Sequence, residues 1–200
     1  MKLKNIKIFL LLSLVIYLLT AFNCQVRVKN KEVKKIIRQQ VKNLSQKNLQ
    51  KITSISFTNL NLTEVPEVIS YMKNLDNLDL SGNKISRIPN FIKNNQKLLQ
   101  LNLSNNELVN FPKDILTLKS LEILYLSNNK IFEIPDGINS LQKLKELYIS
   151  NNELADISDN FIELYNIKYL DLSNNRLTKI PSYYNPSLLY INLENNLLES

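Results

Sequence analysis

Residues 121–131 read LEILYLSNNKI, and residues 144–154, which begin 23 positions later, read LKELYISNNEL. Both stretches place apolar residues at their first, fourth, sixth and eleventh positions and Asn at their ninth position. The apolar alternation in the middle of each stretch is typical of a short strand that directs its apolar side chains to one side. The recurrence indicates a repeat architecture, in which each unit buries its apolar face against its neighbours.

The same pattern begins every 23 residues at six positions, and a seventh copy follows after 21 residues: Ile52, Leu75, Leu98, Leu121, Leu144, Ile167 and Leu188. Six copies carry the Asn, whereas the first has Leu60 in its place: Asn83, Asn106, Asn129, Asn152, Asn175 and Asn196. A Pro column follows at Pro66, Pro89, Pro112, Pro135 and Pro181, with Ser158 as the exception. Over residues 52–200 this pattern resembles the leucine-rich-repeat family.

The resemblance implies an α/β repeat fold, a right-handed horseshoe-shaped solenoid of about seven repeats, the last of them incomplete. Its strands should form one parallel sheet on the concave side, about 4.7–4.9 Å apart. Because Pro disfavours a long helix, we expect short 3₁₀ or irregular segments on the convex side. Each Asn side chain should satisfy backbone groups in the turn after its strand, so that the six form a continuous ladder.

The first 23 residues have the pattern of a secretory signal peptide, with three lysines before an apolar run from Ile8 to Phe22. Cys24, the only cysteine, follows directly and resembles the lipidated cysteine of bacterial lipoproteins. That family favours Leu three residues before the cysteine and a small residue just before it, where this chain has Ala21 and Asn23. An ordinary cleaved signal and an uncleaved anchor are the alternatives. All three place the rest of the chain outside the cytoplasm, as a membrane-anchored lipoprotein or a secreted protein.

Residues 24–51 form a basic segment, with nine Lys and Arg residues against Glu32 alone. Their apolar residues are spaced like one face of a helix, which predicts an N-terminal cap for the solenoid: Val33, Ile36, Ile37, Val41 and Leu44. Its basic face either points to water or rests on anionic lipid, and a disordered spacer is the remaining alternative. From Ile52 onward the chain has 13 basic and 17 acidic residues, so the net charge of +7 gives no reason to expect nucleic-acid binding.

Catalytic and metal-binding constellations are missing from the sequence. The chain contains no His and one Cys, and its two glycines do not form a phosphate-binding loop. Asp79 and Asp171 occupy equivalent repeat positions and are expected to be ordinary exposed strand residues. The sequence therefore predicts a protein that is not an enzyme and needs no cofactor or metal.

Two columns of exposed side chains flank the second apolar position of each repeat. The first three repeats offer only small or polar groups there, whereas the later repeats bring together aromatic and charged ones: Ile123, Tyr125, Glu146, Tyr148, Tyr169, Asp171 and Tyr190. Aromatic residues beside a few charges are typical of protein interfaces, although Tyr is also a favourable exposed strand residue. We expect these seven residues to bind a protein ligand of unknown identity. The alternatives are a carbohydrate or cell-wall-binding module and a self-associating surface protein that uses its open C-terminal edge.

Overall fold

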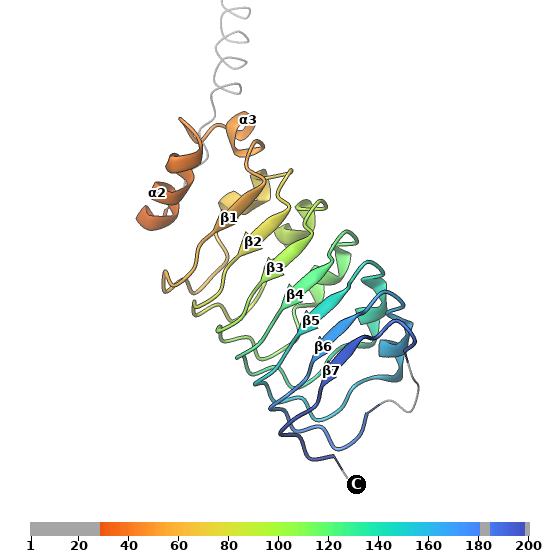
Figure 1. The fold of residues 1–200 in the computed structure, drawn as a ribbon. Helices are drawn as coiled ribbons and strands as arrows, with labels where there is room; N and C mark the ends of the chain where they lie inside the picture. Colours follow the sequence, from red (N-terminus) through yellow and green to blue (C-terminus); the bar gives the residue numbers. More distant parts are fainter. Residues whose placement is uncertain (1–28, 181–184, 199–200) are drawn as a thin grey trace, which may run out of the picture.

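The computed structural model describes residues 29–180 and 185–198 (Figure 1). The expected signal peptide at 1–23, Cys24 and Pro181 lie outside these ranges. Within them, none of the helices combines the length and the apolar character that crossing a bilayer requires.

Seven three-residue strands form one parallel sheet in chain order, which confirms the predicted repeat architecture. Neighbouring strands pair in register, so that Ile55 lies opposite Leu78 and Leu124 opposite Leu147. The strands are β1 (Ser54–Ser56), β2 (Asn77–Asp79), β3 (Gln100–Asn102), β4 (Ile123–Tyr125), β5 (Glu146–Tyr148), β6 (Tyr169–Asp171) and β7 (Tyr190–Asn192). The central residue of β1 to β6 is buried and its two neighbours face outward, as alternation along a strand requires. We call the outward side the sheet face.

Short 3₁₀ helices occupy the side opposite the sheet, as the Pro column predicts (Figure 1). They are η1 (Glu67–Tyr71), η2 (Asn90–Asn94), η3 (Lys113–Thr117), η4 (Asp136–Ser140) and η5 (Asp159–Glu163). Each begins directly after a Pro of the column, or after Ser158 in the case of η5. Pro fixes the backbone φ angle and donates no hydrogen bond, so it suits the residue that precedes such a turn. The amide three residues after the Pro then donates to the Pro carbonyl, as the Ile69 amide does to Pro66 at 3.1 Å.

The space between sheet and 3₁₀ helices is one continuous apolar core. Strand residues such as Leu124 and helix residues such as Ile115 and Ile138 are fully buried in it. The core opens at the last strand, where Ile191 occupies the central position of β7 and is 41% exposed. The packing is thus complete for a repeat with neighbours on both sides and partial for β7 within the described residues.

Six Asn side chains connect successive turns. The Asn152 Oδ1 accepts a hydrogen bond from the Ile131 amide at 2.9 Å. Its Nδ2 donates to the carbonyls of Leu126 at 3.0 Å and of Ile149 and Ser150 at 3.1 Å. The same bonds recur at every Asn of the column, with Asn129 and Asn196 half-buried and the others buried: Asn83, Asn106, Asn129, Asn152, Asn175 and Asn196.

The residue before each of these six Asn residues has a left-handed backbone, a feature that the sequence analysis missed. Its φ is 56° at Asn105, 58° at Asn128 and 68° at Gly82. Asn and Gly tolerate this conformation better than other residues do. The recurring Asn-Asn pair therefore has two purposes, since the first residue permits the turn and the second satisfies its buried backbone groups.

The N-terminal cap is a helix, but it is shorter than the apolar spacing predicts. The helix α2 (Lys31–Gln40) buries Val33 and Ile37 and begins at Asn30, whose Oδ1 accepts from the Glu32 and Val33 amides. It ends because Val41 adopts an extended conformation. A second, four-residue helix, α3 (Gln46–Leu49), follows, and both lie at the β1 end of the sheet (Figure 1). Val41 and Leu44 still reach the core, from the connection between the two helices.

Asn95 is a fully buried polar residue in a column that also holds the buried residues Met72, Leu118, Leu141 and Leu164, and, in the last repeat, the half-buried Asn185. Its Nδ2 donates to the carbonyls of Ile69 at 3.0 Å and Met72 at 2.9 Å. Its Oδ1 is buried and has no hydrogen-bond partner. Both carbonyls also accept a backbone amide, from Met72 and Leu75, so neither depends on Asn95.

We therefore expect Asn95→Leu to raise the free energy of unfolding by about 1 kcal/mol or more, because it removes an unpaired buried acceptor and adds apolar burial. Thermal and denaturant unfolding would measure the change. The reverse substitution at an equivalent position, Leu118→Asn, should destabilise the protein. A destabilised Asn95→Leu variant would contradict this account of the column.

Candidate functional site

The seven residues expected to bind a ligand all lie on the sheet face, on four adjacent strands. Ile123 and Tyr125 belong to β4, Glu146 and Tyr148 to β5, Tyr169 and Asp171 to β6, and Tyr190 to β7. The register arranges them in two neighbouring columns. The first column is Ile123, Glu146, Tyr169 and Tyr190, and the second is Tyr125, Tyr148 and Asp171. We call these seven residues the aromatic patch.

Tyr125 and Tyr148 are the stacked pair of the aromatic patch. Their rings stack at a centroid distance of 4.9 Å and an angle of 8° between planes. The strand spacing of a sheet, about 4.7–4.9 Å, sets this separation, because the two residues are direct neighbours in the register. Tyr169 and Tyr190, which are 39% and 52% exposed, extend the aromatic surface in the neighbouring column.

Glu146 links the two columns, since its Oε2 accepts a hydrogen bond from the Tyr148 hydroxyl at 2.9 Å. Burial, followed by this hydrogen bond and the negative charge of Glu146, raises the pKa of Tyr148 to about 12. Burial and the same carboxylate also raise the pKa of Tyr125. Both tyrosines are therefore neutral hydrogen-bonding groups at any physiological pH.

The raised pKa has a measurable consequence at alkaline pH. A neutral Tyr148 is favoured in the folded state, so its contribution to stability is full below pH 10 and is lost as pH rises from 10 to about 12. In a spectrophotometric titration we expect one of the nine tyrosines to ionise in a separate late phase, near pH 12. Tyr148→Phe should abolish this late phase, and Glu146→Gln should move it to lower pH. A titration with no late phase in the folded protein would contradict the Glu146–Tyr148 contact.

The column that contains Tyr125 and Tyr148 has a structural use in other repeats. The Oδ1 atoms of Asp79, Asn102, Asp171 and Asn192 each accept the amide two residues later, at 2.9–3.1 Å. Asp79 and Asp171 are thus strand residues that also stabilise the turn, a role that their sequence position did not suggest. The hydroxyl of a tyrosine lies too far from its own backbone to accept a hydrogen bond from the amide two residues later. The repeats of β4 and β5 therefore exchange a turn-stabilising side chain for an aromatic ring.

Ion pairs beside the patch were also missed from sequence. Lys145 Nζ lies 2.6 Å from Glu122 Oε2, next to β4 and β5. The other two ion pairs among the described residues are Arg176 with Glu153 at 3.3 Å and Lys179 with Asp156 at 3.2 Å. In all three the partners are 23 positions apart. Opposite charges separated by one repeat length are the sequence signal that would have found them.

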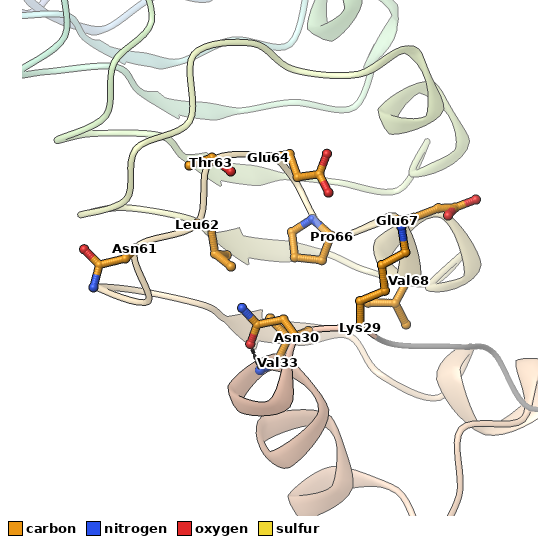
Figure 2. A pocket seen from close by; sticks show the side chains of 10 residues that line it. All are labelled: Lys29, Asn30, Val33, Asn61, Leu62, Thr63, Glu64, Pro66, Glu67 and Val68. Atoms are coloured by element: carbon orange, nitrogen blue, oxygen red, sulfur yellow. Dashed lines mark hydrogen bonds between the residues drawn. The ribbon is translucent and has the colours of Figure 1, made fainter.

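The other end of the sheet face is polar and carries a shallow hollow over β1 to β3. Side chains with hydroxyl, amide and carboxylate groups line it: Ser54, Ser56, Asn77, Asp79 and Gln100. A further depression of about 230 Å³ lies between the start of α2 and the first repeat (Figure 2). Its charged lining residues are one lysine, Lys29, and two glutamates, Glu64 and Glu67. Across the described ranges, no group of three or more His, Cys, Asp or Glu side chains is placed to hold a metal ion.

The stacked parallel strands, the Asn turns and the exposed sheet face define a repeat solenoid of the kind that suggests a protein–protein interaction module. The leucine rich repeat family model matches residues 73–131, 119–177 and 142–198, which together cover more than half of the chain, and the chain belongs to that family.

Solved structures agree with this assignment. A leucine-rich-repeat protein of Leptospira interrogans is 30% identical in sequence with a TM-score of 0.63, over 76% of this chain and 45% of that one. This chain thus spans less than half the length of that relative. Internalin C2 of Listeria monocytogenes is 21% identical with a TM-score of 0.52, over 83% of this chain and 94% of that one, and shows the fold alone. No curated protein matches the sequence.

Proposed function

We propose that this protein is a non-catalytic recognition module that binds a protein ligand through the aromatic patch of its sheet face. The observation that carries the proposal is the parallel stack of Tyr125 and Tyr148, in which the Tyr148 hydroxyl donates a hydrogen bond to Glu146. Rings already held by a sheet and by each other lose little conformational entropy when a partner binds. Aromatic residues fixed in this way are the kind that concentrate binding energy in protein interfaces.

Tyr125 and Tyr148 are not simply the residues that the strand position requires. Four other repeats place Asp or Asn there and gain a bond to the following turn. Losing that bond costs about 1 kcal/mol in each of the two repeats. A ligand that uses the rings would account for this cost.

Affinity selection with the immobilised protein tests the proposal. We expect to select a protein ligand that binds the sheet face. An immobilised Tyr125→Ala variant should therefore recover much less of this ligand than the immobilised native protein does. Retention of the same ligand by both proteins would place its binding site elsewhere.

A carbohydrate ligand is the second candidate, and the polar hollow over β1 to β3 favours it. Hydroxyl, amide and carboxylate groups such as those of Ser54, Asn77 and Asp79 are suited to hydrogen-bond sugar hydroxyls, and tyrosines on the same face are suited to pack against sugar rings. A glycan array distinguishes the two candidates. Sedimentation of the unliganded protein tests the third alternative, self-association through the exposed edge at β7.

We further propose that the module acts outside the cytoplasm, held there by a lipid on Cys24. The support is the sequence pattern of residues 1–24, in which an apolar run is followed at once by the only cysteine. We expect the native protein to incorporate labelled palmitate in a bacterial host and to partition into detergent, and Cys24→Ala to lose both properties. A native protein that is unlabelled and stays in the aqueous phase would refute lipidation.

A further inference from the structure

The column of Tyr125 and Tyr148 changes abruptly from large to small side chains at β6. Tyr125 covers one face of the Tyr148 ring, and the opposite face lies toward β6, where the register pairs Tyr148 with Asp171. Asn192 is the next residue of the column. Because Asp and Asn are short, the stack of rings ends at Tyr148 and leaves the position above Asp171 without an aromatic side chain.

Groups around this position carry negative charge or an electron-rich face. The Asp171 Oδ1 accepts from the Ser173 amide at 3.1 Å and from its hydroxyl at 2.7 Å. Among the described residues, no donor bonds its Oδ2. Glu146 is held against the Tyr148 hydroxyl, and Tyr169 lies one strand away in the neighbouring column. A cation above Asp171 would therefore meet a carboxylate on one side and the face of a ring on the other.

Nearby cations compete little for this position. Lys145 is paired with Glu122 at 2.6 Å. Lys168 is exposed and directly precedes β6. The Lys168 amide donates to the Lys145 carbonyl, so Lys168 lies in the same column as Lys145, at the opposite end of β6 from Asp171.

We propose that the aromatic patch recognises an arginine side chain of its protein partner, whose guanidinium stacks on Tyr148 as a third layer and pairs with Asp171. This inference rests on the proposed function and names the chemistry of the partner at that site. Arginine suits the position better than lysine, because a planar guanidinium stacks on an aromatic ring while its N–H groups remain available to a carboxylate.

The test uses the full chain and N-acetyl-arginine methylamide as the probe, followed by NMR titration. We expect saturable shifts centred on β5 and β6. The citrulline analogue has nearly the same shape without the charge and should bind at least about fivefold more weakly, as should the lysine analogue. Equal binding of arginine and citrulline, or of arginine and lysine, would overturn the proposal.

Asp171→Asn is a structurally conservative variant for the carboxylate. Asn102 and Asn192 occupy the same column and accept the same turn bond at 3.0 Å, so the substitution should preserve the fold. We expect it to raise the Kd for the arginine probe about fivefold. The matched control is Asp79→Asn, which makes the same turn bond in a repeat without aromatic neighbours and should leave the Kd unchanged. An unchanged Kd for Asp171→Asn would overturn the ion pair.

Tyr148→Leu and Tyr148→Phe separate stacking from the hydroxyl. The Phe variant keeps the ring and should still bind the probe, whereas the Leu variant should lose about fivefold or more in affinity. Thermal melting verifies that both are folded, and a Leu variant that binds normally would overturn the stacking.

The proposed function and the arginine site can fail separately. If a selected protein ligand depends on Tyr125 and Tyr148 but the arginine probe fails to bind, the arginine site is wrong and the proposed function stands. If the probe binds at Tyr148 and Asp171 but no protein ligand uses the sheet face, the proposed function is wrong and the guanidinium site stands.

Discussion

Replacing Asn152 with Ala is expected to lower the free energy of unfolding by about 3 kcal/mol, because it leaves several buried backbone groups without partners. The side chain satisfies the amide of Ile131, which is fully buried, and the carbonyls of Leu126 and Ile149. Alanine supplies none of these bonds, and the turn is closed to water by repeats on both sides. Chemical denaturation of the native protein and the variant measures the difference.

Asn196→Ala is the matched control. Asn196 makes the same bonds, to the Leu177 amide and to the carbonyls of Leu172 and Leu193, but in the last described repeat, where it is half-buried. Water can replace a lost partner there, so we expect a cost of about 1 kcal/mol. Equal losses at Asn152 and Asn196 would show that burial by neighbouring repeats is not what makes the ladder important.

Removal of either stacked ring is expected to have the second large effect, on ligand affinity. Tyr125→Ala and Tyr148→Ala should each weaken binding of the selected protein ligand by about 2 kcal/mol or more, which is about thirtyfold in Kd. The two losses should not add, because each substitution also removes the partner against which the other ring is held. Calorimetric titration of the single and double variants measures both the losses and their coupling.

Controls for this experiment lie at the polar end of the same sheet. Ser56→Ala and Asn77→Ala replace exposed residues of β1 and β2 and should change the Kd by less than about twofold, as rim positions do. Melting temperatures of all variants should stay close to the native value, since the substituted side chains lie outside the apolar core. If the tyrosine variants bind normally while α2 or 3₁₀-helix variants do not, the ligand-binding site lies outside the aromatic patch.

Much of the architecture follows from the period of the sequence. The spacing of Leu121, Leu124 and Leu126, repeated 23 residues later, predicted the strands, their parallel stacking and their register, and the structure confirms these features. The Pro column correctly predicted short 3₁₀ helices in place of long ones. These predictions succeed because each repeat has the same few apolar positions, and only one stacked arrangement buries all of them.

The cap departs from such a pattern. The spacing of Val33, Ile37, Val41 and Leu44 fits one continuous helical face, yet α2 ends at Gln40. Both Val41 and Leu44 are buried from the connection between α2 and α3. The spacing of apolar residues predicts only which side chains are buried. A helix can bury them, and so can a turn that packs over the end of the first repeat.

The sequence alone determined that this chain is a leucine-rich-repeat solenoid and that Tyr125 and Tyr148 face outward, because strand alternation leaves them no other direction. Only the tertiary structure decided that their rings stack at 4.9 Å and that Glu146 is bound to one of them. Contacts of this kind depend on side-chain torsions and on neighbours from other strands. A repeat period fixes which backbone segments are adjacent, whereas the contacts between side chains on an exposed face depend on the torsions that they adopt in the folded sheet.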